Sequence, residues 1–192
     1  MNNEFYRAFE DANRGSRETI LQRLHIYQPI LKALCLEHGE SPRALDIGCG
    51  RGEWLELLVE CGLDAHGVDL DEGMLEESQN GKLNVLKQDG LVALQQLEAN
   101  SLSLISLFHV VEHMNFQTML EIFKEALRVL KPGGLLIAET PNPENLTVGT
   151  NSFYLDPTHI KPINNQRRYQ GCLALDAIKV PMVWMLSLAT AE

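Results

Sequence analysis

The 192-residue sequence has few cysteines, a deficit of basic residues and no long uninterrupted apolar run. Its four cysteines show no paired spacing and it opens without a signal-like apolar segment, so we expect a reducing, cytoplasmic setting. The net charge of −10 argues against an extended nucleic-acid partner. The most apolar stretch, 173–190, is interrupted by charges and a proline, so no integral membrane segment is predicted.

What is present indicates one α/β domain. Hydrophobic residues make up 45% of the chain, enough for a single sizeable core. Short apolar runs alternate with segments of helical spacing, which predicts a doubly wound, mostly parallel sheet with helices on both faces. The expected strands are 43–47, 65–70, 83–87, 101–108 and 135–139. The expected helices are 53–61, 71–79, 118–130 and 19–37, the last kinked or divided at Pro29.

A glycine-rich loop follows the first expected strand. In A-L-D-I-G-C-G-R-G-E-W, residues 44–54, Gly48, Gly50 and Gly52 stand at alternate positions before an amphipathic segment. Such glycines remove the Cβ atoms that would keep a ligand off the backbone, and the helix start presents unpaired N–H groups. The alternative is an ordinary turn that needs glycine only for its dihedral angles.

Acidic residues follow the next two expected strands. Asp69 ends the strand after the glycine loop, where an acid can accept hydrogen bonds from a ribose diol. Asp89 follows the next strand and could accept from an adenine amino group, or else form an Asx turn or a helix N-cap. His109 follows the fourth strand. These residues and the glycine loop are therefore expected at the carboxyl edge of the sheet, where doubly wound folds bind ligands.

Four motifs in this order resemble the motif series of Rossmann-like, class I S-adenosylmethionine-dependent methyltransferases. They are D-I-G-C-G-R-G at 46–52, G-V-D at 67–69, Q-D-G at 88–90 and L-R-V-L-K-P-G-G-L-L at 127–136. The flanking runs F-Y-R-A-F-E, R-G-S-R-E, P-N-P-E-N-L-T-V-G-T and F-Y-L-D-P-T-H are similar to the methyltransferase domain of bacterial O-antigen chain-terminating methyltransferases. The resemblance implies methyl transfer from S-adenosylmethionine to an oxygen of a small-molecule or glycan acceptor, including a terminal phosphate, in lipopolysaccharide biosynthesis.

The resemblance also implies a role for each residue of the cofactor site. Gly48 and Gly50 would face the methionine part, Asp46 would order the loop or bind the amino group, and Asp69 would hold the ribose hydroxyls. Asp89 would take the adenine amine, with Leu70 and Gly90 lining the base pocket. Phe108 and His109 would bracket the sulfonium, and an N-terminal arm would close over the cofactor. The expected cofactor-binding set is Tyr6, Arg23, Asp46, Gly48, Gly50, Asp69, Leu70, Asp89, Gly90 and Phe108.

The expected catalytic residues are His109, His159 and Arg7. Methyl transfer is an in-line displacement, so catalysis consists mostly of alignment. A phosphate acceptor needs no general base, and Arg7, Arg14, Arg17 and His159 are candidates for holding it. A sugar hydroxyl needs a base, which His109, His113 or His159 could supply because histidine titrates near neutrality.

Two other enzyme classes share parts of these motifs. A nicotinamide dehydrogenase has G-x-G-x-x-G, whereas here the third glycine, Gly52, comes one residue early. The run H-V-V-E-H at 109–113 fits the H-x-x-E-H zinc-protease motif, which needs both histidines on one face of a helix. Because this run emerges directly from an apolar strand, no metal site is predicted.

The expected organisation is a helical arm or lid at 1–42, a methyltransferase core at 43–163 and an atypical short C-terminal segment at 164–192, all within one domain. The last segment contains at best one apolar stretch and no convincing hairpin, so the family's C-terminal hairpin is expected to be missing or altered. An exposed sheet edge there would favour a homo-oligomer. The atypical C-terminal segment also leaves open the alternative that the chain is a cofactor-binding remnant or an interaction module without turnover.

Overall fold

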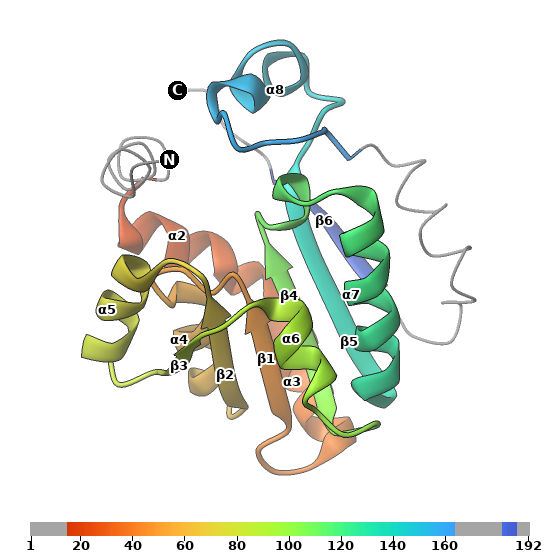
Figure 1. Ribbon diagram of the computed structural model, residues 1–192. Helices are drawn as coiled ribbons and strands as arrows, with labels where there is room; N and C mark the ends of the chain where they lie inside the picture. The colour runs from red at the N-terminus through yellow and green to blue at the C-terminus, as the bar shows by residue number, and fades with distance from the viewer. Residues whose placement is uncertain (1–14, 164–181, 188–192) are drawn as a thin grey trace.

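The computed structural model describes residues 15–163 and 182–187. These residues build one sheet with the strand order β3-β2-β1-β4-β5-β6, and every neighbouring pair runs parallel (Figure 1). The strands are β1 (Arg43–Ile47), β2 (Asp64–Asp69), β3 (Asn84–Lys87), β4 (Leu102–Phe108), β5 (Leu130–Pro141) and β6 (Met182–Ser187). The doubly wound α/β prediction is confirmed.

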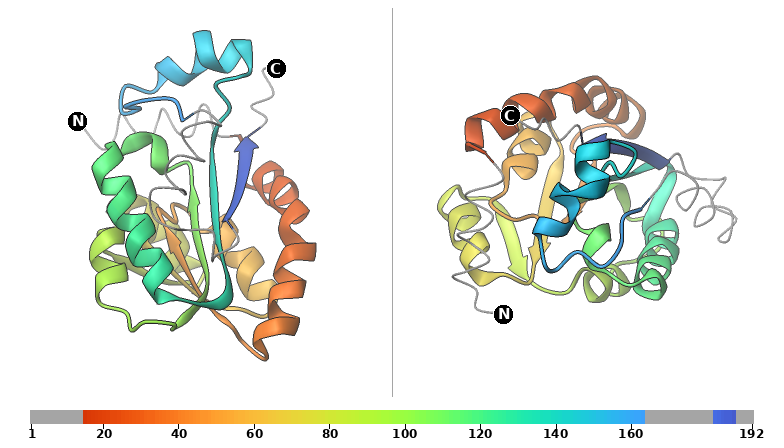
Figure 2. Two further views of the ribbon diagram at one scale, coloured as in Figure 1. Left: turned by 90° about the vertical axis from the view of Figure 1, so that its right-hand side faces the viewer. Right: turned by 90° about the horizontal axis from the view of Figure 1, so that it is seen from above.

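Helices cover both faces of this sheet. The α-helices are α2 (Arg17–Leu24), α3 (Gln28–His38), α4 (Glu53–Glu60), α5 (Glu72–Asn80), α6 (Gly90–Gln95), α7 (Phe116–Val129) and α8 (Leu146–Thr150). Short 3₁₀ turns are η1 (His25–Tyr27), η2 (Val111–His113) and η3 (Ser152–Leu155). Seen along the sheet edge, α6 and α7 lie on one side and α2 and α3 on the other (Figure 2).

Alternate residues along a strand pack into two separate hydrophobic cores, one on each face of the sheet. In β4, Ile105 and Leu107 pack with α6 and α7, whereas Leu104 packs with α2, α3 and α4 on the opposite face. Successive side chains of a strand point to opposite faces, so a run that is apolar throughout is buried on both sides. All three of these residues are fully buried. This two-sided burial is what the continuous apolar runs of the sequence predict.

Most expected strands and helices are found within one or two residues of their predicted bounds, and the larger departures are at α6, β5 and α8. Pro29 does divide the first helical segment, because α2 ends at Leu24 and Pro29 lies in the first turn of α3. Helix α6 was not expected; Asp89 caps it by accepting from the Val92 backbone N–H at 3.0 Å. Strand β5 starts at Leu130 rather than 135, because Leu130 already pairs with Leu102 before an irregularity in the register.

The C-terminal part of the sheet also differs from the expected exposed edge of β5. Strand β6 pairs in parallel with β5 from Leu136 to Pro141, so β5 is an interior strand and β6 is the last strand in the order. Beyond residue 181 the described residues supply this single strand, in line with the absence of a hairpin signal in the sequence. Within 15–163 and 182–187, no helix is long and apolar enough to cross a membrane.

Candidate functional site

The glycine-rich loop is tied to the end of the neighbouring strand. Gly48, Gly50 and Gly52 have φ angles of +73°, +52° and +85°, a region that L side chains rarely adopt. The Gly48 N–H donates to the Val68 carbonyl at 2.8 Å, and the Gly50 N–H donates to Asp69 Oδ2 at 2.9 Å. The loop is therefore held against β2 at the carboxyl edge of the sheet.

Two of these glycines are also required by packing within the protein. A Cβ on Gly48 would lie 2.3 Å from Val110 Cγ2, and a Cβ on Gly52 would lie 2.4 Å from Leu83 Cδ1. The space beside these two positions is thus filled by the chain's own side chains. Packing is thus a further reason for glycine at these two positions, beside the backbone angles and the predicted approach of a ligand.

Asp69 offers the acceptor chemistry that a ribose diol requires. Its Oδ1 accepts from the Asp71 N–H at 2.9 Å and its Oδ2 accepts from Gly50, so each oxygen has one bond. A carboxylate has about four lone-pair sites, which leaves capacity for two hydroxyl donors. Asp69 is half-buried and the neighbouring Leu70 side chain is 66% exposed, so a polar acceptor and an apolar surface lie side by side. These residues fit the ribose and base of S-adenosylmethionine.

Asp89 and Gly90 lie at the start of α6. The Asp89 side chain is exposed and caps this helix, which is the N-cap alternative considered from the sequence. Gly90 packs so closely on β1 that a Cβ there would lie 2.3 Å from Ile47 Cγ2. Capping uses Asp89 Oδ1, so an adenine contact through the same carboxylate is compatible with the cap and stays a prediction.

Asp46 lies beneath the loop, inside the core. It is 2% exposed and accepts from the Ser106 hydroxyl at 2.7 Å, while Ser106 in turn accepts from Trp54 Nε1 at 2.8 Å. This buried chain of hydrogen bonds links β1, β4 and α4. Of the two roles expected for Asp46, ordering the loop and binding the amino group of the cofactor, both stay predictions.

An aromatic cluster stands behind the end of β4. Tyr27, Trp54 and Phe108 pack with ring centroids 4.7–5.4 Å apart. The Tyr27 hydroxyl donates to Glu139 Oε2 at 2.7 Å, at the end of β5. Sequence reasoning missed Tyr27 and Glu139 as site residues. The rule that selected Asp69, an acid ending an apolar strand, would also have selected Glu139.

His109 lies between two carboxylates. Its backbone takes a φ of +56°, held by its N–H donating to the Glu139 carbonyl at 2.8 Å. Nδ1 is 3.3 Å from Glu112 Oε1 and Nε2 is 3.5 Å from Glu139 Oε1. Burial by itself lowers the pKa of His109, but the two carboxylates outweigh it and raise this pKa to about 9. The ring is therefore cationic at neutral pH, contrary to the expectation that it titrates near neutrality.

The two carboxylates respond in the opposite sense. Burial tends to raise the pKa of Glu139, but His109, the Tyr27 hydroxyl and the positive charge of Arg23 lower it below its ordinary value. Burial likewise opposes ionisation of Glu112, and His109 again lowers its pKa. Arg23 is an exposed residue of α2 whose charge acts on Glu139, and its predicted contact with the cofactor stays a prediction.

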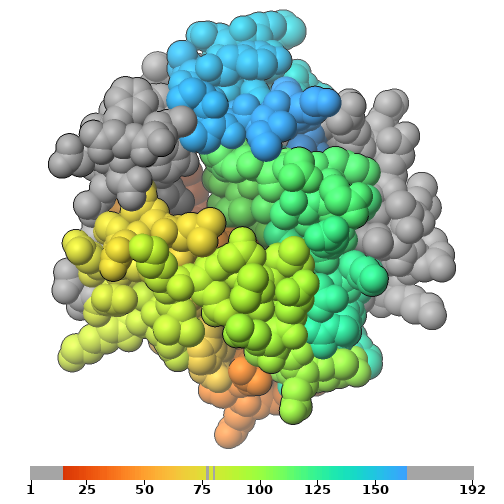
Figure 3. Space-filling model, in the orientation of Figure 1, coloured from red at the N-terminus to blue at the C-terminus, as the bar shows by residue number. Residues whose placement is uncertain are grey.

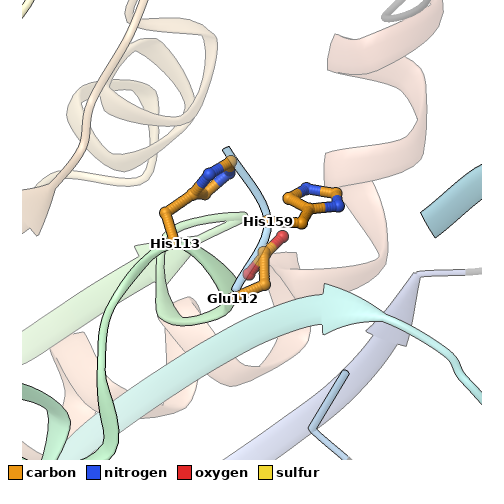
Figure 4. Close-up of side chains that lie close together, drawn as sticks. All are labelled: Glu112, His113 and His159. Carbon is orange, nitrogen blue, oxygen red and sulfur yellow. The ribbon is translucent and has the colours of Figure 1, made fainter. Parts of the chain in front are cut away.

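His113 and His159 lie close to each other and to Glu112 (Figure 4). The His113 and His159 ring centroids are 4.7 Å apart. Glu112 and His113 belong to the short turn η2, after which Met114 is extended, so His109 and His113 do not share one face of a helix. The exclusion of the zinc-protease arrangement is thus supported by the backbone.

The remaining predicted residues fall outside this group. Tyr6, Arg7 and Arg14 lie outside the described residues, so their roles stay predictions. The Arg17 guanidinium is 2.6 Å from Glu56 and 3.6 Å from Glu53, which commits it to the start of α4.

The surface is hollowed near the carboxyl edge of the sheet. The segments that follow β2 (yellow) and β4 (green) flank this hollow, and residues 141–163 (blue) lie above it (Figure 3). The end of β1 carries Gly48, the end of β2 carries Asp69 and the end of β4 carries His109, as expected for a ligand site at the carboxyl edge.

A family model described as a methyltransferase domain matches residues 20–171 of the chain. A crystal structure of an S-adenosylmethionine-dependent methyltransferase from Archaeoglobus fulgidus superimposes with a TM-score of 0.79 at 37% identity. That match covers 89% of this chain and 73% of the other.

Curated relatives match over shorter stretches. A probable S-adenosylmethionine-dependent methyltransferase of Mycolicibacterium smegmatis is 29% identical over 120 residues, covering 62% of this chain and 46% of the relative. A ubiquinone biosynthesis O-methyltransferase of Methylococcus capsulatus is 26% identical over 129 residues, covering 64% and 54%. The chain thus spans about half the length of the curated relatives it matches. The family model and the fold show that the chain belongs to the class I S-adenosylmethionine-dependent methyltransferases, which use S-adenosylmethionine as methyl donor.

Proposed function

We propose that this chain transfers a methyl group from S-adenosylmethionine to an oxygen atom of a small-molecule or glycan acceptor. The observation that carries the proposal is the Asp69 carboxylate, fixed by the Gly50 and Asp71 N–H groups beside the exposed Leu70, in a chain of this family. The name of the Methylococcus relative, an O-methyltransferase, supports an oxygen acceptor.

The bound cofactor supplies an electrophilic methyl group, and the residues of the chain bind, orient and exclude water. Asp69 holds the ribose end, and the glycine loop, which is bonded to Val68 and Asp69, positions the methionine end. A cationic His109 cannot take a proton from an acceptor hydroxyl. His159 can, because its Nδ1 donates to the Phe153 carbonyl at 2.6 Å and the neutral ring then presents Nε2 as a proton acceptor.

The narrower proposal is a glycan acceptor in surface-polysaccharide biosynthesis. Its support is the flanking sequence motifs alone, since the matched family and the relatives named above carry no such description. With a phosphate terminus, Arg7 and His159 would hold the acceptor and no base would be needed.

Turnover is tested by measuring S-adenosylhomocysteine after incubating the purified chain with S-adenosylmethionine and one acceptor at a time. A catechol, a reducing sugar and a sugar phosphate represent the three oxygen chemistries. We expect acceptor-dependent product with one class.

Two results would contradict methyl transfer by this chain. Cofactor binding without product from any acceptor class would favour the remnant or interaction module. Hydride transfer with NAD and no S-adenosylhomocysteine would favour the oxidoreductase.

A further inference from the structure

Three side chains that sequence reasoning did not combine converge beside the methyl-donor site. Glu112, His113 and His159 each offer a ligand atom, and these atoms all lie within 4.8 Å of one another (Figure 4). We propose that they bind a divalent transition-metal ion of the Zn²⁺ type. This departs from the expectation of no metal site, and it does not depend on the proposed methyl transfer. A bound ion occupies Nε2 of His159, so His159 acts as a proton acceptor only when no metal is bound.

The hydrogen bonds of His159 prepare it as a ligand. Its Nδ1 lies 2.6 Å from the Phe153 carbonyl oxygen, which can only accept, so Nδ1 carries the proton. In the neutral ring Nε2 is then the nitrogen with the lone pair. Metal-binding histidines characteristically donate their other N–H to a carbonyl or carboxylate in this way.

His113 is oriented by a second chain of hydrogen bonds. The Thr158 hydroxyl donates to Asp156 Oδ1 at 2.6 Å, so its one proton is already used. His113 Nδ1, 2.8 Å from the same oxygen, must therefore be the donor in that contact. In the neutral form of this ring, Nε2 is then the nitrogen with the lone pair. Here the Asp156 carboxylate orients His113 through the Thr158 hydroxyl, and outer partners of this kind hold metal-binding histidines in place.

Glu112 supplies a buried carboxylate. It is 1% exposed, and its Oε2 accepts from the Thr140 hydroxyl at 3.0 Å. Its Oε1 is buried and makes no hydrogen bond within the described residues, although His109 Nδ1 lies 3.3 Å away. A buried carboxylate oxygen that makes no hydrogen bond has lone pairs left to bind a metal ion.

The two segments that provide the ligands are joined by the backbone. The Ile160 N–H donates to the Glu112 carbonyl at 2.8 Å, which holds the residue after His159 against η2. Ligand atoms around a tetrahedral ion at about 2.0–2.2 Å are roughly 3.3–3.5 Å apart, so atoms up to 4.8 Å apart must approach by up to about 1.5 Å on binding.

The donor set determines the class of metal. Two imidazoles and one carboxylate suit Zn²⁺ and its neighbours in the transition series, whereas Mg²⁺ prefers oxygen ligands and retains its waters. Three protein ligands also leave a coordination position for water or for an oxygen of an acceptor.

The test is a calorimetric titration of the full chain, free of any histidine tag, with Zn²⁺ alone. Co²⁺, whose visible spectrum reports tetrahedral nitrogen and oxygen ligands, is titrated in parallel. We expect one equivalent to bind. His113→Ala and His159→Ala should abolish this binding, and Thr158→Val should weaken it by about 10- to 100-fold because it releases His113.

His66→Ala is the matched control, since His66 lies in β2 away from this group and should bind metal as the wild type does. Glu112→Gln keeps an acceptor for Thr140 and removes the charge, so it tests the buried ligand with the fold preserved. Thermal unfolding of each variant confirms folding. The proposal is overturned if the wild-type chain binds no stoichiometric metal, or if His113→Ala and His159→Ala bind it unchanged.

Discussion

The charge of His109 depends on one carboxylate that is close in the sequence, Glu112, and on one from a distant strand, Glu139. The ring lies between Glu112 of η2 and Glu139 of β5, and Glu139 is also bonded to Tyr27 near the N-terminus. The charge at His109 is therefore balanced within the site. A neutral Tyr27, buried with 1% exposure, donates the hydrogen bond that completes the arrangement.

The Tyr27–Glu139 hydrogen bond is expected to stabilise the fold measurably. Tyr27→Phe keeps the ring in the aromatic cluster and removes only the hydroxyl. A hydrogen bond to a charged group is worth about 1.5–3 kcal/mol, and we expect the free energy of unfolding at pH 7 to fall by about that amount. Urea denaturation measures it.

The same variant predicts a pH dependence. The pKa of Glu139 is lowered in the folded protein: burial raises it, but His109 and Tyr27 outweigh burial. Such a group stabilises the fold above its unfolded pKa of about 4.3, and this stability is lost as the pH falls through the folded pKa. The difference in free energy of unfolding between the wild type and Tyr27→Phe should therefore become smaller below about pH 4.

Tyr154→Phe is the control, since Tyr154 is 64% exposed, and it should change stability by less than about 0.5 kcal/mol. Equal losses of unfolding free energy in Tyr27→Phe and Tyr154→Phe would contradict the role given to Glu139. So would a difference between the wild type and Tyr27→Phe that does not change with pH.

At the scale of the elements, the glycine loop acts as the joint between β1, α4 and the α5–β3 connection. Gly52 precedes α4 with a φ of +85°, and Leu83 and Ser78 approach the position where its Cβ would lie. The alternate glycines thus serve the packing of the helix as well as the turn.

Gly52→Ala should therefore lower the free energy of unfolding by more than the backbone strain alone would. Gly62 is the matched control, because its φ is +94° but no atom lies within 4 Å of the position of a Cβ. Both substitutions place alanine in the left-handed region, at about 1–2 kcal/mol. Gly52→Ala adds overpacking, so we expect it to lower the free energy of unfolding by about 1–3 kcal/mol more than Gly62→Ala.

Shortening the opposing side chain identifies the cause of that difference. If the clash with Leu83 is responsible, Gly52→Ala should cost less when it is introduced into a Leu83→Ala background than into the wild type. Equal unfolding energies for Gly52→Ala and Gly62→Ala would show that only the dihedral angle matters.

Elements with a strong local pattern were predicted from the sequence, and those set by distant partners were not. The strand 43–47 has the predicted bounds and Pro29 divides the first helical segment, because apolar periodicity and proline chemistry are local. Strand β5 was predicted too short because its first residues pair with β4 across an irregular register. Helix α6 was missed, although its Asp89 N-cap had been noted.

The same division holds for the site. Asp69 and His109 could be placed at the carboxyl edge from the rule that ligands bind where parallel strands end. The raised pKa of His109 could not be predicted, because it depends on Glu139 of the distant strand β5 as well as on the nearby Glu112. The approach of His159 to Glu112 and His113 could not be predicted either, because it requires the 141–163 segment to fold back over η2.

At the scale of the whole molecule, the parallel sheet places the glycine loop, Asp69 and His109 at one edge, and residues 141–163 lie over that edge (Figure 1). The central claim is that this edge binds S-adenosylmethionine. Asp69 is its most direct probe, because its contacts are known and its carboxylate has acceptor capacity left. Asp64, exposed at the opposite end of the same strand, provides a matched control.

The decisive measurement is calorimetric titration of the wild type, Asp69→Asn and Asp64→Asn with S-adenosylmethionine, with NAD as a competing ligand. Losing hydrogen bonds to a charged group costs about 1.5–3 kcal/mol, so Asp69→Asn should bind about 10- to 100-fold more weakly. Asp64→Asn should bind as the wild type does, and NAD should not compete. A folded wild-type chain that does not bind S-adenosylmethionine, or equal affinities for wild type and Asp69→Asn, would contradict the account.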